Sequence, residues 1–450
     1  MMRPPTLERP HRPAVSRQPA RVWPILAFSA IVVLLATNAL AWYLLFQDES
    51  PTDQPTASSL APTTTVTLPT ITGAPLIIDP GDLGVYGRND FRGNIALTGE
   101  TNGGFRNLAG SYWEPVRPGG FFGADPIAYG RFLYVVSATH DVVYAVDQTS
   151  GVIRFTMQTN GRMQTAPAVG QFTYSTGPEG TSETATRLIA VSEDGTVYSR
   201  NALGGGSSQH WQMNLGSDVS AAPLIADDKI IVATESGSVI AVGGDHEIVW
   251  RYPVPNTYVS PFFHTPAISD GTIYAADDNG RLHLISLSNG EPICTPIATG
   301  MRPSSHPVVA DNQVIIPTDG SILVIPTDRC NAAPRLIVDQ IDSPLSPAYA
   351  DGTVYAAENS FLMAWDLDTL AANVWDGPFT AGSRITTPPT VAEGVVYFGT
   401  QDGTVYAVDS ETGSALWQFK VGDSIFGGPV VTTNGIFVIT ADEIISIAGG

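Results

Sequence analysis

A unit of about 41 residues recurs eight times along this 450-residue chain and limits the folds that it can adopt. In each copy a proline closes a cluster of small residues and precedes an apolar stretch. The spacings between these prolines are 41, 56, 43, 41, 40, 42 and 40 residues, for Pro126, Pro167, Pro223, Pro266, Pro307, Pro347, Pro389 and Pro429. A period of 40–45 residues is typical of the blades of a β-propeller. The repeat therefore predicts an all-β, eight-bladed β-propeller of four-stranded antiparallel blades, with an expanded second copy.

The internal pattern of one copy supports this prediction. Residues 384–421 alternate apolar, strand-forming stretches with the turn pairs Glu393-Gly394, Asp402-Gly403 and Thr412-Gly413. An Asp-Gly pair between two apolar runs is a strong hairpin signal. No helical periodicity is evident after residue 76, so we expect the whole repeat region to form strands.

The two ends of the repeat region complement each other. The last copy supplies only three apolar stretches before the chain ends, whereas Gly110–Val116 precedes the first copy and aligns with the fourth strand of the seventh. We therefore expect both termini to close the last blade, which would leave no unpaired edge in the ring.

The region before the repeats predicts a membrane anchor. Residues 1–21 carry five arginines and one glutamate, and residues 22–46 contain no charge. As a helix, 25 residues span about 37 Å, more than the ~30 Å hydrocarbon core of a bilayer. The positive-inside rule then predicts a cytoplasmic leader (1–21), one transmembrane helix (22–46) and a propeller (76–450) outside the cytoplasm. A cleaved signal peptide is the alternative, because Ala39-Leu40-Ala41 is an acceptable cleavage site.

Residues 47–75 predict an extended linker, because they are rich in Pro, Thr and Ser. The chain after residue 46 contains 17 basic and 42 acidic residues, a net charge of −25. Such a surface repels nucleic acid, so we expect no nucleic-acid partner.

The repeats resemble those of the PQQ-type (quinoprotein-like) propeller family. Ala407-x-Asp409-x-x-Thr412-Gly413-x-x-x-Trp417 matches the family motif, and Ala145-x-Asp147 with Gly151 and Phe155 is similar to it. The resemblance implies that an aromatic side chain in the fourth strand docks between blades. The tryptophans at or near this place are Trp113, Trp211, Trp250, Trp375 and Trp417.

Candidate binding residues lie five positions before each repeat proline, in the loop that enters the innermost strand. We expect this set to surround one mouth of the central channel, where propellers commonly bind ligands. Its polar and aromatic members include Phe121, Arg162, Asp218, Arg302, Asp342 and Arg384. A solvated rim that is satisfied by its own ion pairs is the alternative interpretation.

Neither the cysteines nor the histidines predict a metal or redox centre. Cys294 and Cys330 are the only cysteines; they can form a disulfide between neighbouring blades or remain free thiols. Metal-ligand spacings such as HExxH and CxxC are absent, so we expect no metal site. PQQ-dependent members of the family carry adjacent cysteines over the cofactor, which this chain lacks, so the site residues do not support a PQQ cofactor.

These observations favour a non-enzymatic scaffold or binding propeller in the cell envelope. The resemblance extends to the propeller lipoprotein of the β-barrel assembly machinery and implies an envelope protein as the partner. The arginines Arg162, Arg302 and Arg384 favour a small anionic ligand or an acidic partner segment. A quinoprotein dehydrogenase that uses PQQ and calcium is one alternative. An extracellular sensor is the other, although a leader of 21 residues is too short to hold a catalytic signalling domain.

Overall fold

The computed structural model of the chain describes residues 100–101, 104–120, 122–175, 182–204, 210–253, 260–341, 344–370 and 374–449. The chain divides into two compact units, Met1–Ile77 and Ile78–Gly450. The predicted leader, membrane helix and linker lie outside the described residues. Within the described part of the chain, no helix is long and apolar enough to cross a membrane.

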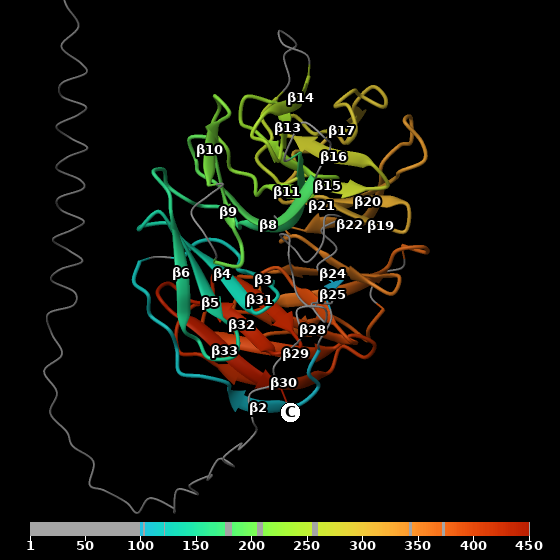
Figure 1. Ribbon diagram of the computed structural model, residues 1–450. Coiled ribbons are helices and arrows are strands. Elements are labelled where there is room, and N and C mark those ends of the chain that lie inside the picture. The colour runs from blue at the N-terminus through green and yellow to red at the C-terminus, as the bar shows by residue number, and fades with distance from the viewer. Residues whose placement is uncertain are drawn as a thin grey trace, which may run out of the picture. The chain divides into compact units, whose positions relative to one another are not determined.

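The second unit is an eight-bladed β-propeller (Figure 1). The described residues form strands and no helix, and the first strands of most neighbouring blades contact each other. The prediction of an all-β, eight-bladed propeller is confirmed. Blades one to four contain β3 (Ile127–Tyr129), β4 (Phe132–Ser137), β5 (Val142–Asp147) and β6 (Ile153–Gln158); β7 (Ala168–Ser175), β8 (Ser182–Val191), β9 (Thr196–Asn201) and β10 (Trp211–Asn214); β11 (Leu224–Ala226), β12 (Lys229–Ala233), β13 (Val239–Gly243) and β14 (Ile248–Tyr252); β15 (Ala267–Ser269), β16 (Thr272–Asp277), β17 (Arg281–Ser286) and β18 (Ile297–Ala298).

Blades five to eight repeat the same order of strands. They contain β19 (Val308–Ala310), β20 (Gln313–Thr318), β21 (Gly320–Pro326) and β22 (Arg335–Ile341); β23 (Ala348–Ala350), β24 (Thr353–Glu358), β25 (Phe361–Asp366) and β26 (Phe379–Thr380); β27 (Thr390–Ala392), β28 (Val395–Gly399), β29 (Thr404–Asp409) and β30 (Ala415–Lys420); β31 (Gly427–Thr432), β32 (Gly435–Ile439), β33 (Ile444–Gly449) and β2 (Leu108–Ser111). The two middle strands of each blade are the most apolar, because both of their faces pack against neighbouring blades.

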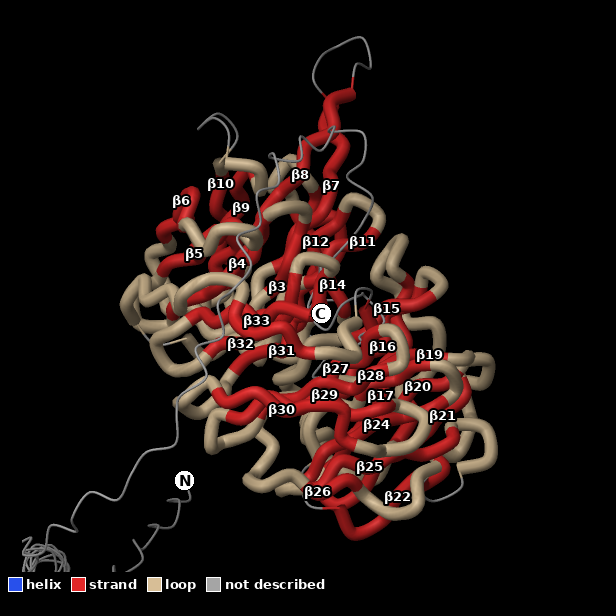
Figure 2. Tube along the Cα trace, turned by 90° about the horizontal axis from the view of Figure 1, so that it is seen from below, coloured by secondary structure: helices blue, strands red, loops and turns tan. Residues whose placement is uncertain are grey.

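The expansion of the second copy lies in one hairpin. Strands β7 and β8 have 8 and 10 residues, and they pair from Ala168↔Ile189 to Ser175↔Ser182. Figure 2 shows this hairpin projecting beyond the body of the propeller. The additional residues therefore lengthen one pair of strands and leave the ring unchanged.

The last blade is closed by both termini, as the sequence predicts. Strand β2 pairs antiparallel with β33, and the pairing joins Leu108 to Gly449 and Ser111 to Ile447. The strand begins two residues earlier than the predicted Gly110–Val116. It ends at Ser111, because the Trp113 N–H donates to the Ser446 hydroxyl (2.9 Å) and Pro115 has no N–H, although Val116 still bridges Ile444.

Blade seven carries one strand that the sequence did not predict. Strand β1 (Glu100–Thr101) pairs parallel with the innermost strand β27, and Glu100 lies opposite Val391. The Thr101 hydroxyl donates to the Val431 carbonyl in blade eight (3.3 Å). The chain therefore passes along the central channel before it reaches strand β2 at the outer edge of the ring.

Candidate functional site

The predicted rim residues that the structure describes lie on one face of the propeller. In blades two, three, five and seven, the carbonyl of the rim residue accepts a hydrogen bond from the turn between the second and third strands of the same blade. These donor–acceptor pairs are Glu193→Arg162, Glu235→Asp218, Asp319→Arg302 and Gln401→Arg384, at 2.8–3.0 Å. We call the face that carries these loops and turns the rim face. Phe121 and Asp342 lie outside the described residues.

Ion pairs hold two of the three rim arginines. Arg162 lies 3.6 Å from the Glu193 carboxylate, and Arg302 pairs with Asp278 in the neighbouring blade four. Their side chains nevertheless remain 61% and 56% exposed. Arg384, in blade seven, is also exposed. The guanidinium groups are thus partly oriented by acidic turns and still accessible from solvent.

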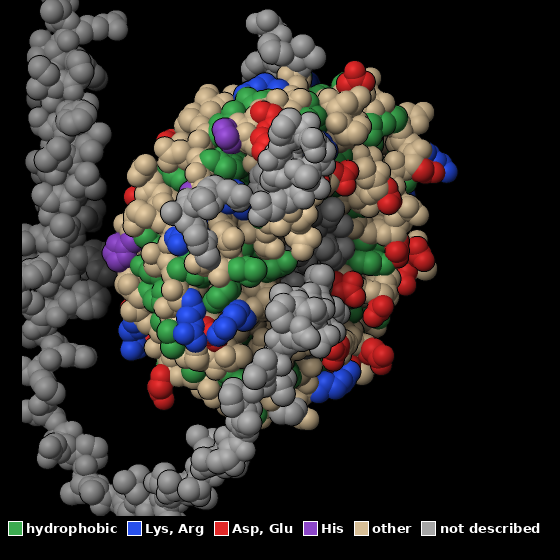
Figure 3. All heavy atoms as spheres, viewed as in Figure 1, with side chains coloured by type: hydrophobic (Ala, Val, Ile, Leu, Met, Phe, Trp, Pro, Cys, Tyr) green, Lys and Arg blue, Asp and Glu red, His purple; other side chains and the backbone are tan. Residues whose placement is uncertain are grey.

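Acidic side chains outnumber basic ones on much of the propeller surface. In the view of Figure 3, they gather on the part of the ring that carries β24 and β25. Because like charges repel, an anionic ligand or segment would avoid most of this surface. The exposed arginines on the rim face are therefore a local exception.

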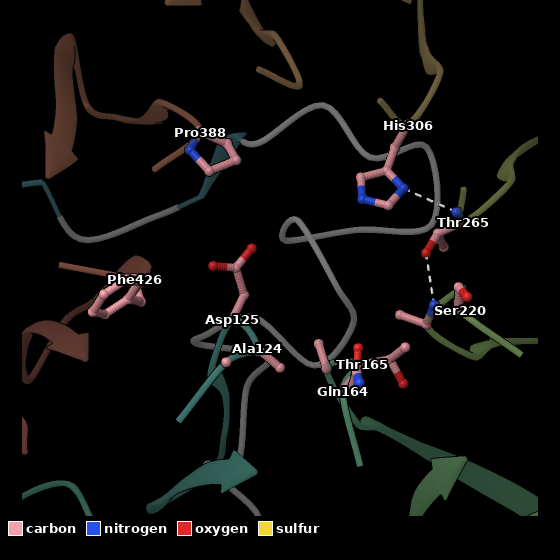
Figure 4. A pocket seen from close by; sticks show the side chains of 12 residues that line it. Ala124, Asp125, Gln164, Thr165, Ser220, Thr265, His306, Pro388 and Phe426 are labelled. Carbon is pink, nitrogen blue, oxygen red and sulfur yellow. Dashed lines mark hydrogen bonds between the residues drawn. The ribbon is translucent and has the colours of Figure 1, made fainter. Parts of the chain in front are cut away.

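A polar cavity of about 210 Å³ opens near the centre of the rim face (Figure 4). Its walls come from the loops that enter the innermost strands, and seven of the eight blades contribute. Gln164 and Ser220 are exposed at its outer part, whereas Ala166, Ala222 and Thr265 are buried. Phe426, which is 43% exposed, adds an aromatic surface.

A relay of hydrogen bonds connects neighbouring blades around this cavity. It uses the residue directly before each repeat proline, whose N–H donates to the side chain of the equivalent residue in the next blade. The donors are Ala222 to Thr265 (2.8 Å), Thr265 to His306 Nδ1 (2.9 Å), His306 to Ser346 (3.2 Å) and Gly428 to Asp125 (2.9 Å). The relay requires a side-chain acceptor, which Ala166 and Ala222 lack.

The two histidines beside the cavity are part of this structural network. His264 and His306 contact edge to face, with ring centroids 5.5 Å apart, and His264 Nε2 lies 3.2 Å from the Pro303 carbonyl. Burial lowers the pKa of His264. Within the described ranges, no group of three or more His, Cys, Asp or Glu side chains could hold a metal ion.

Aromatic side chains of the fourth strands contact the next blade on the opposite face. The indole N–H groups of Trp113, Trp250 and Trp375 donate to the carbonyls of Gln148, Leu287 and Ser410 at 2.9–3.1 Å. Each ring covers a turn glycine with positive φ; a Cβ on Gly290 would lie 2.5 Å from Trp250, and one on Gly413 2.6 Å from Trp375. Only glycine fits these turns without displacing the ring.

The two remaining tryptophans dock differently. Trp417 donates to the Phe105 carbonyl (3.1 Å), which belongs to the segment leading into strand β2. Trp211 lies 5.8 Å from the His246 ring in the next blade, and its indole N–H has no acceptor among the described residues.

The comparisons with known proteins agree with this geometry. Residues 162–376 and 371–448 match the family described as outer membrane protein assembly factor BamB, which is more than half of the chain. The chain belongs to this family. The BamB protein of Burkholderia pseudomallei is 24% identical over 335 residues, which cover 70% of this chain and 83% of that protein. The matches to the BamB proteins of Yersinia pestis and Salmonella typhimurium span only about half of their length.

Two solved structures share the BamB-like fold of this chain. BamB from Moraxella catarrhalis superposes with a TM-score of 0.57 at 18% identity, over 76% of this chain and 99% of that one. Quinohemoprotein alcohol dehydrogenase from Comamonas testosteroni superposes with a TM-score of 0.61 at 13% identity, over 80% of each chain. These similarities establish a common fold. They do not establish the function, which must be inferred from the residues of the site.

The described residues that line the cavity do not fit the quinone cofactor of such dehydrogenases. PQQ carries several carboxylates, which require cationic or multiple hydrogen-bonding partners. The described residues that line the cavity include no Arg or Lys and one carboxylate, Asp125, which would repel the cofactor.

The two cysteines also lie away from the channel. They form a disulfide with Cα atoms 5.8 Å apart at the junction of blades four and five. Cys294 stands in the fourth-strand place that tryptophan takes elsewhere. Thr327 is the counterpart in blade five of Leu287, whose carbonyl accepts the indole N–H of Trp250. Cys330 lies three residues after Thr327, as Gly290 lies three residues after Leu287, so the disulfide replaces a tryptophan–glycine dock.

Proposed function

We propose that the protein is a membrane-anchored scaffold of the cell envelope, whose propeller lies outside the cytoplasm and binds an acidic segment of a partner protein at the rim face. The observation that carries the proposal is the set of three exposed arginines, Arg162, Arg302 and Arg384, on one face of a region whose net charge is −25. Planar guanidinium groups bind carboxylates with two parallel hydrogen bonds, so they suit such a segment.

Membership of the BamB family supports an envelope partner, because the family is described as an assembly factor for outer membrane proteins. The anchor in this proposal is the apolar segment 22–46, which carries no charge. The channel residues favour binding over oxidation, because they do not fit PQQ.

Replacing the three rim arginines with glutamate tests the proposal. Each exposed charge contributes only about 0–1 kcal/mol to stability, so the variant is expected to fold. It should lose the partner proteins that the wild type retains after crosslinking in membranes. The matched control replaces with glutamate three arginines that are exposed on the opposite face, Arg106, Arg329 and Arg335. This control should retain the partner proteins. Equal capture by both triple variants would refute the rim proposal.

A further inference from the structure

The relay of hydrogen bonds around the channel has a gap in blades one to three. Asp125 and Ala166 take the donor places of the relay in the repeat, but the next residues in it are Ala166 and Ala222, which have no side-chain acceptor. Neither N–H has an acceptor within the described part of the chain. Ala166 is buried, and buried backbone donors are almost always paired with protein or ordered water, so its N–H can bond an acceptor that occupies the cavity.

A side chain at the same place is also unpaired. The Thr165 hydroxyl is buried without a hydrogen-bond partner among the described residues, its residue is 7% exposed, and it lines the cavity. The floor of the cavity thus concentrates donors that face an acceptor-rich occupant.

The residues of the cavity wall determine which ligand charge the site can accommodate. The Gln164 amide donates and accepts hydrogen bonds. The Ser220 hydroxyl donates to the Glu235 carboxylate and can still accept a hydrogen bond, and the Asp125 carboxylate only accepts them. A carboxylate or phosphate would meet Asp125 without an Arg or Lys among the described lining residues, and a cation would meet the donors of the floor. Hydroxyl groups suit both sides, because each one donates and accepts at once.

We propose that this cavity binds an uncharged, hydroxyl-rich molecule, namely one saccharide unit. The cavity volume of about 210 Å³ holds several waters and therefore has room for one small ring. The aromatic face of Phe426 lies beside the polar groups and can cover the apolar C–H face of a sugar ring. The arginines of the rim are not part of this site.

Binding is measured on the full chain in a detergent without a sugar headgroup. The probes are glucose and N-acetylglucosamine, with glucuronate as the charged counterpart, and binding is followed by calorimetry and by saturation-transfer NMR. We expect saturable binding of at least one neutral probe, and at least tenfold weaker binding of glucuronate. The rim variant with three glutamates should bind the neutral probe as the wild type does, which separates this proposal from the proposed function.

Two variants test the site directly. Ala222→Thr copies Thr265 and supplies the acceptor that the Ala166 N–H lacks, so it should raise the melting temperature and weaken probe binding at least tenfold. Thr165→Val removes the unpaired hydroxyl and should weaken binding without unfolding the protein. The matched control is Thr327→Val, whose hydroxyl bonds the Asn312 carbonyl far from the cavity (3.0 Å); it should bind normally.

Three results would overturn the proposal. The first is that no neutral probe binds at concentrations of tens of millimolar. The second is that Ala222→Thr gains stability and still binds the probe as the wild type does. The third is that probes bind only after residues 78–99 are deleted, because the occupant would then be a part of the chain itself.

Discussion

The disulfide between blades four and five gives the most quantitative prediction. Replacing both Cys294 and Cys330 with alanine opens a loop with a sequence separation of 36 residues. In the chain-entropy model, the loss of such a crosslink lowers the free energy of unfolding by about 3–4 kcal/mol. Urea unfolding of the purified protein, followed by tryptophan fluorescence, measures the change. The blade junction also loses its only counterpart of the tryptophan dock, so the first unfolding event should involve blades four and five.

A second pair of substitutions separates the crosslink from the dock. Cys294→Trp with Cys330→Gly restores the residue types found at Trp250 and Gly290. If the disulfide occupies a docking place, this variant should recover part of the stability that the alanine pair loses. The interpretation would be refuted if the alanine pair unfolds at the wild-type urea concentration, or if the Trp–Gly pair is less stable than the alanine pair.

Three further predictions follow from the fold. Deleting Leu108–Ser111 exposes the edge of strand β33 and should cause aggregation, which light scattering detects; a monomeric variant with an unchanged melting temperature would contradict the observed closure. Trp250→Ala should cost about 3–5 kcal/mol, because the ring is buried and hydrogen-bonded, and calorimetry that finds no loss would show that the dock contributes nothing. Burial by itself would raise the pKa of Asp147, but hydrogen bonds from Thr149 and Arg131 and the charge of Arg131 hold it below its usual range. Its contribution to stability is therefore present above about pH 4 and is lost as the pH falls further, and Asp147→Asn should remove this part of the acid sensitivity in unfolding curves.

The fold was predictable because short sequence patterns define each repeat. Prolines, turn glycines and apolar stretches recur in phase, and each of them acts within a few residues. The closure by both termini followed from counting strands in the last copy. Strand β1 was not predictable, because Glu100 and Thr101 have no strand pattern of their own and become a strand only by pairing with β27, nearly 300 residues later in the chain.

The site was predictable only in part. Counting five residues back from each proline located the rim loops, because the same backbone hydrogen bond recurs in blades two to five and seven. The relay lies one residue before the proline, where Asp, Ala, Thr, His, Ser, Pro and Gly share no residue type. The relay consists of hydrogen bonds between neighbouring blades, so it can be recognised only in the structure, where Ala222, Thr265 and His306 lie side by side.

Photo-crosslinking in living cells tests the central claim most directly. A photoreactive amino acid is placed in turn at Arg162, Arg302 and Arg384 on the rim face and at Arg106, Arg329 and Arg335 on the opposite face, in the full-length anchored protein. The account predicts one discrete protein adduct from the rim positions and none from the opposite ones. Adducts from the opposite face alone, or equal adducts from both faces, would contradict the account of the rim as the binding surface.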